Sequence, residues 1–187
     1  MIGYALCGSF CSHAASLQAL RALLAAGEEV QPILSAAAYE TDTRFHPAKT
    51  FREELATLCG RSVIHTIAEA EPLGPARPLE LLIIAPCTGN TLAKMAHGIT
   101  DTSVTMAAKA HLRTGKPLLI ALATNDALSA NLDNLARVSM RKGVYFVPLV
   151  QDDPTGKPYS LVADFTRIGE ALAAARRGEQ LRPLFWH

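Results

Sequence analysis

Short apolar runs alternate with amphipathic stretches along most of the chain. We expect strands at residues 2–6, 30–34, 63–67, 81–85, 117–123 and 144–147. We expect helices at residues 13–26, 48–58, 91–96, 103–112, 128–142 and 165–177. This alternation is typical of a parallel sheet covered by helices on both faces. The pattern therefore predicts one α/β domain over residues 1–187, a three-layer, Rossmann- or flavodoxin-like doubly wound parallel sheet.

All five residues at 81–85 are apolar, so both faces of the expected strand are apolar, as is typical of a central parallel strand. Three segments interrupt the alternation and are expected to be loops: residues 36–47, 71–78 and 151–159. Gly27 and Gly60 stand where a helix commonly ends in a glycine. The sequence shows no internal repeat and no linker between domains.

The composition indicates a globular domain and excludes some classes of partner, but it does not indicate a function. The chain has 187 residues, of which 49% are hydrophobic and 19% charged, which is typical of a globular domain. The net charge is +1 and the cations are scattered, so we expect neither nucleic acid nor a membrane surface as a partner. The first residues lack the features of a signal peptide, and the expected location is the cytoplasm.

The four cysteines give no sign of a metal site. Cys7, Cys11, Cys59 and Cys87 are expected to be free thiols, as is usual in a reducing compartment. No second pair of Cys or His residues stands at the spacing of a zinc site. We therefore expect no metal.

Small and hydroxylated residues follow the first expected strand. Gly8 allows a tight turn, and Ser9 and Ser12 offer hydroxyl groups just before a helix. A helix N-terminus with such neighbours suits a phosphate group, although Ser12 could instead be only a capping residue. Ser35, at the end of the second expected strand, is a weaker candidate, for which a capping role is at least as good an explanation.

The loop after the central strand is the second candidate for ligand binding. Residues 85–91 hold one glycine, two threonines and one asparagine immediately before a helix. Such a loop can surround a ligand with backbone donors and short polar side chains. The alternative is a capped strand-to-helix turn, which leaves the clustering of small polar residues unexplained.

The run PCTGNTLAKMAHGITD resembles the P-x-S-A-N-T-x-A-K-x-A-x-G-x-x-D motif of the flavin-dependent cysteine decarboxylase superfamily. Thr88 and Gly89 replace the serine and alanine of the motif. The resemblance implies flavin mononucleotide (FMN) as cofactor. The residues that it implies for cofactor binding are Gly8, Ser9, Phe10, Ser35, Pro86, Cys87, Thr88 and Thr91.

Other segments are similar to the dipicolinate synthase B-subunit family within this superfamily: residues 41–45, 104–113, 123–126, 145–148, 151–154 and 160–165. This resemblance implies one half of an oxidoreductase that works with the dipicolinate synthase A-subunit in the mother cell of a spore-forming bacterium. Together they would oxidise a dihydro- or hydroxytetrahydro-dipicolinate to dipicolinic acid, with NAD(P) used by the partner. The superfamily also implies a homo-oligomer.

The departures from the decarboxylase pattern argue against thiol oxidation and loss of carbon dioxide. The histidine that precedes the central strand in the decarboxylases is absent from residues 72–75, and no cysteine follows Cys87. The P-x-M-N motif is reduced to residues 122–125, which keep only the asparagine. Two alternatives to a redox enzyme stay open, namely a non-catalytic accessory protein that binds flavin or phosphate, and a diverged flavin-dependent decarboxylase.

A dicarboxylate substrate needs cations and N–H donors. The candidates for substrate binding are Arg44, Lys109 and Arg113, and the candidates for catalysis are Asn90, Lys94 and Asn125. For each cation alone, a solvated surface position is the simpler explanation. His97 and His111 could carry protons, but for each an ordinary surface or structural role is the better explanation.

Overall fold

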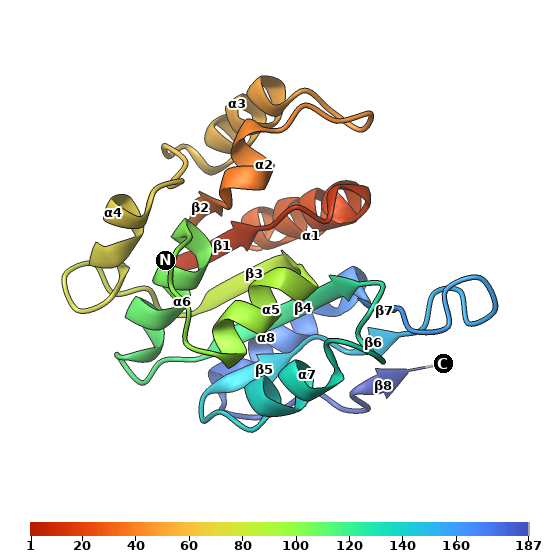
Figure 1. Ribbon diagram of the computed structural model, residues 1–187. Helices are drawn as coiled ribbons and strands as arrows, with labels where there is room; N and C mark the ends of the chain where they lie inside the picture. Colours follow the sequence, from red (N-terminus) through yellow and green to blue (C-terminus); the bar gives the residue numbers. More distant parts are fainter. Residues whose placement is uncertain (187) are drawn as a thin grey trace.

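The computed structural model describes residues 1–186, which form one sheet covered by helices on both faces (Figure 1). The parallel part of the sheet has the strand order β2-β1-β3-β4-β5. These strands are β1 (Ile2–Leu6), β2 (Val30–Leu34), β3 (Leu82–Cys87), β4 (Leu118–Thr124) and β5 (Val144–Phe146). The predicted fold class is confirmed, because this is the order of a flavodoxin-like doubly wound sheet.

The helices form two layers. On one face, α1 (His13–Ala25) packs against α8 (Ile168–Arg176), and on the other α5 (Gly89–Ala96) packs against α6 (Ser103–Leu112) and α7 (Leu132–Ser139). Near the β2 edge lie α2 (Ala36–Glu40) and α3 (Ala48–Cys59), and α4 (Ile67–Ala70) packs on α6. The 3-10 turns are η1 (Phe10–Ser12), η2 (Glu71–Leu73) and η3 (Phe165–Arg167).

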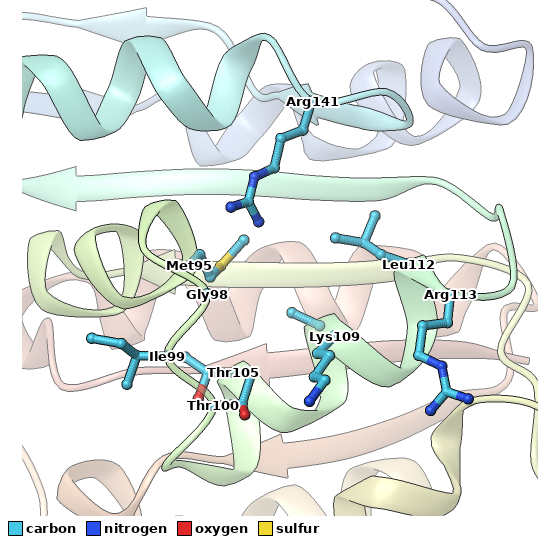
Figure 2. Close-up of a pocket in the computed structure, with 10 residues that line it drawn as sticks. Met95, Gly98, Ile99, Thr100, Thr105, Lys109, Leu112, Arg113 and Arg141 are labelled. Carbon is cyan, nitrogen blue, oxygen red and sulfur yellow. The ribbon is translucent and has the colours of Figure 1, made fainter.

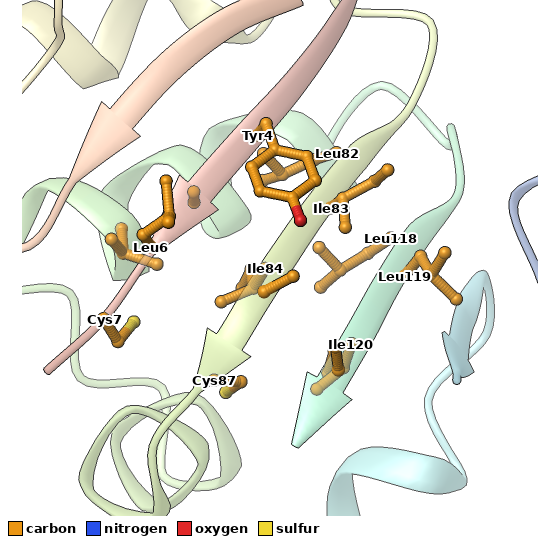
Figure 3. Close-up of a cluster of buried hydrophobic side chains, with 14 of the residues drawn as sticks. Tyr4, Leu6, Cys7, Leu82, Ile83, Ile84, Cys87, Leu118, Leu119 and Ile120 are labelled. Atoms are coloured by element: carbon orange, nitrogen blue, oxygen red, sulfur yellow. The ribbon is translucent and has the colours of Figure 1, made fainter. Parts of the chain in front are cut away.

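The core lies between the central strands and these helices (Figure 3). Every residue of β1 and β3 is buried, which explains why the run at residues 81–85 carries no polar face. The hydroxyl group of Tyr4 donates a hydrogen bond to the Ser16 carbonyl oxygen at 2.9 Å, and the Ser16 hydroxyl donates to the carbonyl oxygen of Ala85. These bonds satisfy the buried polar atoms and fix α1 against the sheet.

Two predicted elements near the β2 edge are wrong. The strand expected at residues 63–67 is reduced to a single bridge between Ile33 and Ile64. The chain turns into α4 there because Thr66 and Glu69 form a reciprocal capping box at its first turn. The loop expected at residues 36–47 begins instead with α2, whose first turn is capped by Ser35.

The C-terminal part adds strands that the sequence pattern did not predict. They are β6 (Leu149–Val150), β7 (Leu161–Ala163) and β8 (Phe185–Trp186). Strand β7 runs antiparallel to the last residues of β4, beyond the point where β5 stops pairing. The loop between β6 and β7 is thereby carried to the carboxyl edge of the sheet. The helix expected at residues 128–142 is shorter, because turns precede it up to Asn131.

None of the helices in residues 1–186 has the length and apolar character that a bilayer crossing requires.

Candidate functional site

A cavity of about 540 Å³ opens at the carboxyl edge of the sheet. Its walls come from the loops after β1, β3 and β4, from residues 44–45, and from the segment between β6 and β7. The strand order reverses between β1 and β3, so the cavity lies at the switch point of the sheet. Doubly wound proteins bind their ligands at this position, because the adjacent loops diverge there.

The first wall is the loop after β1, and its serines are not used for capping. Ser12 precedes α1, but its side chain makes no capping hydrogen bond. Its hydroxyl group lies 3.2 Å from that of Ser9. The N–H groups of Ser12 and His13 are bonded to the carbonyl oxygens of Ser9 and Phe10, so the N–H groups without a partner within the helix are those of Phe10 and Cys11, at the start of η1. The capping explanation for the Ser12 side chain is therefore wrong, and its role in anion binding stays a prediction.

The second wall is the loop after β3, where Thr88 caps α5. The Thr88 hydroxyl accepts a hydrogen bond from the Thr91 N–H group at 3.2 Å and donates one to the Thr91 hydroxyl at 3.1 Å. The Thr91 hydroxyl in turn donates to the Cys7 sulfur at 3.3 Å, which ties this loop to the first wall. Since Thr88 fills the capping position, the side chain of Asn90 is left to line the cavity.

The third wall is the loop after β4, and its position depends on Gly89 in the second wall. Thr124 donates to one carboxylate oxygen of Asp126 at 2.5 Å, and Asn131 donates to the other at 2.9 Å. A Cβ atom on Gly89 would lie 2.6 Å from both the Thr124 hydroxyl and the Asn131 side-chain nitrogen. Gly89 therefore allows the β4 loop, with Asn125, to approach α5 closely.

The rim of the cavity carries two cations. The guanidinium group of Arg44 lies 4.9 Å from the centre of the Phe45 ring, a cation–π contact. Across the opening, Lys157 pairs with Asp152 at 3.0 Å, and Asp152 also accepts a hydrogen bond from Ser160. The Lys157 partner lowers the pKa of Asp152, so this pair is neutral overall at physiological pH. Arg44 thus provides the net positive charge at the rim.

Two histidines connect the Arg44 segment to the first wall. His13 Nε2 donates to the Cys7 carbonyl oxygen at 2.8 Å, so its Nδ1 accepts from His46 Nε2, also at 2.8 Å. Both rings stack on Phe51. Burial lowers the pKa of His13 to about 4, and the neutral form is required for it to accept from His46. The pair holds residues 41–47 against the start of α1.

The structure brings together seven of the residues predicted for the site. Those that line the cavity are Gly8, Ser9, Phe10, Arg44, Thr88, Asn90 and Asn125. The remaining cofactor candidates do not line it. Ser35 caps α2, Cys87 is buried at the end of β3, and Thr91 and Pro86 bond to the loop after β1. Their roles in cofactor binding stay predictions.

Three predicted cations lie elsewhere. Lys94 forms an ion pair with Asp101 at 2.8 Å that closes the connection between α5 and α6. Lys109 and Arg113 line a different groove on the helical layer. Neither Lys109 nor Arg113 lines the cavity, so their predicted roles in substrate binding stay predictions. His111 is fully buried and bonds to the Pro117 carbonyl oxygen, which identifies it as a structural residue.

The sequence prediction missed the contribution of the loop between β6 and β7. Asp152, Lys157 and Ser160 of this loop line the cavity, together with Val162 of β7. The signal was present, because short apolar runs flank the polar segment at residues 149–150 and 161–163, as in a β-hairpin. Among residues 1–186, no three His, Cys, Asp or Glu side chains are placed to hold a metal ion.

The fold and the cavity define a class of protein: a doubly wound α/β protein with a cavity lined by polar side chains at the β1/β3 switch point. The sequence matches the Flavoprotein family over residues 1–170, and the chain belongs to this family.

The chain is similar over nearly its whole length to the dipicolinate synthase B-subunit of Bacillus subtilis (strain 168). The identity is 39% over 183 residues, which cover 98% of this chain and 92% of that protein. The crystal structure of the dipicolinate synthase B-subunit from Bacillus halodurans C superimposes with a TM-score of 0.91 and 37% identity, covering 100% of this chain and 95% of that one. The FMN-dependent cysteine decarboxylase SpaF shares the fold, with a TM-score of 0.66 and 23% identity over 93% of this chain and 95% of that one.

Proposed function

We propose that the cavity at the carboxyl edge of the sheet binds FMN and a small dicarboxylate. The observation that carries this proposal is the convergence of Ser9, Asn90 and Asn125 on one cavity at the switch point. Membership of the Flavoprotein family and the FMN dependence stated for SpaF support the choice of cofactor. The volume of about 540 Å³ is within the range of cofactor pockets.

The donor set fits a phosphate at one end and a carboxylate at the other. Ser9, Ser12 and the N–H groups of Phe10 and Cys11 at the start of η1 suit the phosphate of the cofactor. A Cβ atom on Gly8 would lie 3.3 Å from the Cβ atom of Ala37, so the glycine lets the loop lie close against α2. A bound flavin would supply a two-electron acceptor. The chain would contribute binding and orientation, with Arg44 pairing to a substrate carboxylate and Asn90 and Asn125 donating hydrogen bonds.

The reaction that we propose is the oxidation of a dihydro- or hydroxytetrahydro-dipicolinate to dipicolinic acid. Similarity to the dipicolinate synthase B-subunit supports it, and that name implies an A-subunit as partner. The hydroxytetrahydro compound would first lose water to give the dihydro compound. A hydride from that ring would be transferred to NAD(P) on the partner or to the flavin, and a proton would be released. We propose activity only with the partner, in a homo-oligomer, in the mother cell of a spore-forming bacterium.

A binding role without catalysis is the second candidate function. The cavity supports it because Asp152 and Lys157 neutralise each other and His13 is committed to structural hydrogen bonds. Such a protein would hold flavin or phosphate and shape the substrate site of the A-subunit. The decarboxylase alternative is not favoured, since the loop between β6 and β7 offers no thiol over the cavity.

The variant Asn90→Ser tests the site. It retains a polar helix position but removes the amide, and Thr88 still caps α5. We expect near-normal melting and a loss of about ten- to a hundredfold in affinity for dipicolinate, from one charge-assisted hydrogen bond. The measurements are ligand titration, the visible spectrum of the protein loaded with FMN, and dipicolinate formation with the A-subunit followed by ultraviolet absorbance.

Thr88→Ala is the matched control. Loss of a helix cap should reduce the free energy of unfolding by roughly 1 kcal/mol, which Asn90→Ser should not do. Unchanged binding and unchanged dipicolinate formation in Asn90→Ser would remove Asn90 from the site. Dipicolinate formation by the A-subunit that requires this chain but is equally fast with and without bound flavin would support the accessory role instead.

A further inference from the structure

A second concave site lies on the helical layer, between the end of α5, α6 and the turn after α7 (Figure 2). Its volume is about 370 Å³, within the range of small-molecule sites. Helix α5 begins at the cavity described above, with Gly89 and Asn90, and its last turn brings Met95 to this groove. The two sites therefore lie at opposite ends of one helix.

Three cations line this groove: Lys109, Arg113 and Arg141. None of them forms an ion pair within residues 1–186, and the lining contains no acidic side chain. The nearby Asp101 is paired with Lys94 at 2.8 Å. In a chain whose net charge is only +1, this is a local excess of positive charge without an internal counter-charge.

Arg141 is held in place by the end of α5. It donates a hydrogen bond to the Ala96 carbonyl oxygen at 3.1 Å, and Figure 2 shows it reaching from the turn after α7 toward Met95. The preceding carbonyl oxygens of α5 are already bonded, because Ile99 donates to Lys94 at 2.8 Å and Gly98 donates to Met95 at 3.1 Å. The carbonyl oxygens of Lys94, Met95 and Ala96 thus each accept a hydrogen bond. Arg141 uses one N–H group for this contact, and its other N–H groups are left for a ligand.

The floor of the groove is apolar. Met95 and Ala108 are almost fully buried, Leu112 is half-buried, and Ile99 remains 46% exposed at the edge. The one buried hydroxyl in the lining, that of Thr105, is occupied by hydrogen bonds to Thr102. The half-buried Thr100 also lines the groove, but the floor itself is apolar and favours a ligand with an apolar body.

We propose that this groove binds a small carboxylic acid with a flat apolar body, such as an aromatic acid, separately from the cavity at the carboxyl edge. The ring would cover Met95 and Leu112, and the carboxylate would meet the guanidinium group of Arg141, which reaches toward Met95 (Figure 2). The cation binds the carboxylate of such a ligand and the apolar floor binds its ring. Each contribution can therefore be removed independently, by substituting the arginine or by changing the probe. The proposal does not rest on flavin or on dipicolinate formation.

The test uses benzoate as the probe and the methyl group of Met95 as the reporter. The chain has four methionines, so their methyl NMR signals can be assigned by substitution, here with Met95→Leu. We expect benzoate to shift the Met95 signal saturably and benzamide, its neutral equivalent, to bind at least tenfold more weakly. Arg141→Gln should weaken benzoate binding by about tenfold, the usual effect of losing one charge-assisted hydrogen bond.

Arg137→Gln is the matched control, because Arg137 lies on the exposed side of α7 and is already paired with Asp133 at 2.8 Å. It should leave benzoate binding unchanged. Equal binding of benzamide, an equal loss in Arg137→Gln, or no saturable shift of the Met95 signal would each overturn the proposal. A loss of benzoate binding in Asn90→Ser but not in Arg141→Gln would also overturn it, because the ligand would then occupy the other cavity.

Discussion

Substitution of Gly89 by alanine tests whether the walls of the cavity depend on close contact between α5 and the β4 loop. The added Cβ atom would lie 2.6 Å from the Thr124 hydroxyl and 2.6 Å from the Asn131 side-chain nitrogen, where ordinary contacts begin at 3.4 Å. Neither side chain can move freely, because both hydrogen-bond to the carboxylate of Asp126. The substitution must therefore break part of this network or displace α5.

The expected cost follows from two opposing effects. Overpacking in a well-packed region costs roughly 1–3 kcal/mol, and loss of one hydrogen bond of the network adds roughly 1 kcal/mol. Replacing glycine by alanine within a helix returns roughly 0.5–1 kcal/mol. The sum predicts that Gly89→Ala lowers the free energy of unfolding by about 1–3 kcal/mol, which for a domain of this size lowers Tm by roughly 2–4 °C per kcal/mol.

Gly169→Ala is the matched control for helix propensity. Gly169 also lies in the first turn of a helix, α8, and a Cβ atom there would meet nothing within 4 Å. This variant should raise Tm, while Gly89→Ala lowers it, in parallel thermal melts followed by circular dichroism. In an Asn131→Ala background the penalty of Gly89→Ala should shrink, since one of the two contacts is gone. If Gly89→Ala stabilised the protein as Gly169→Ala does, the argument for a close approach would be refuted.

Two further substitutions probe the surroundings of the sites. The pKa of His13 is lowered from 6.5 to about 4. Below pH 6.5 the unfolded state therefore binds more protons than the folded state, and the contribution of neutral His13 to stability is lost as the pH falls from 6.5 toward 4. Wild type should lose about 2 kcal/mol more between pH 7 and pH 5 than His13→Gln, measured by urea unfolding, and equal losses would contradict the assignment. Gly98, at the end of α5, has φ +72°, so Gly98→Ala should cost roughly 1 kcal/mol; a melt unchanged from wild type would argue against a strained position.

The layered fold could be predicted because its signal is local. The run at residues 81–85 is apolar on both faces, and in the structure β3 is buried on both faces at the centre of the sheet. Predictions failed where a local capping interaction overrode a short apolar run. Thr66 and Glu69 start a helix at the end of the run 63–67, and three residues with apolar side chains cannot compete with that box.

The sequence predicted the chemistry of the candidate site, but it could not predict which of the candidate cations line the cavity. Loops with Gly8, Ser9, Thr88 and Asn90 follow parallel strands, and parallel strands bring such loops to one edge. Lys109 carries the same charge as Arg44, and sequence patterns cannot tell which of the two faces that edge. The helix direction decides this, because α6 begins beside the carboxyl end of β2, where Ser103 bonds to Leu34, and runs away from that edge toward Lys109 in its last turn. Residues 41–47 are instead held at the edge by His13 and His46.

The parallel sheet, the loops that follow its strands and the family to which the chain belongs can all be inferred without coordinates, since each depends on the order of residues along the chain. Other features become visible only when the chain is folded: Thr88 rather than Asn90 caps α5, Thr124 requires Gly89 across the cavity, and Lys109 joins Arg141 in a separate groove. These features depend on contacts between segments far apart in sequence, and close packing, not local pattern, selects them.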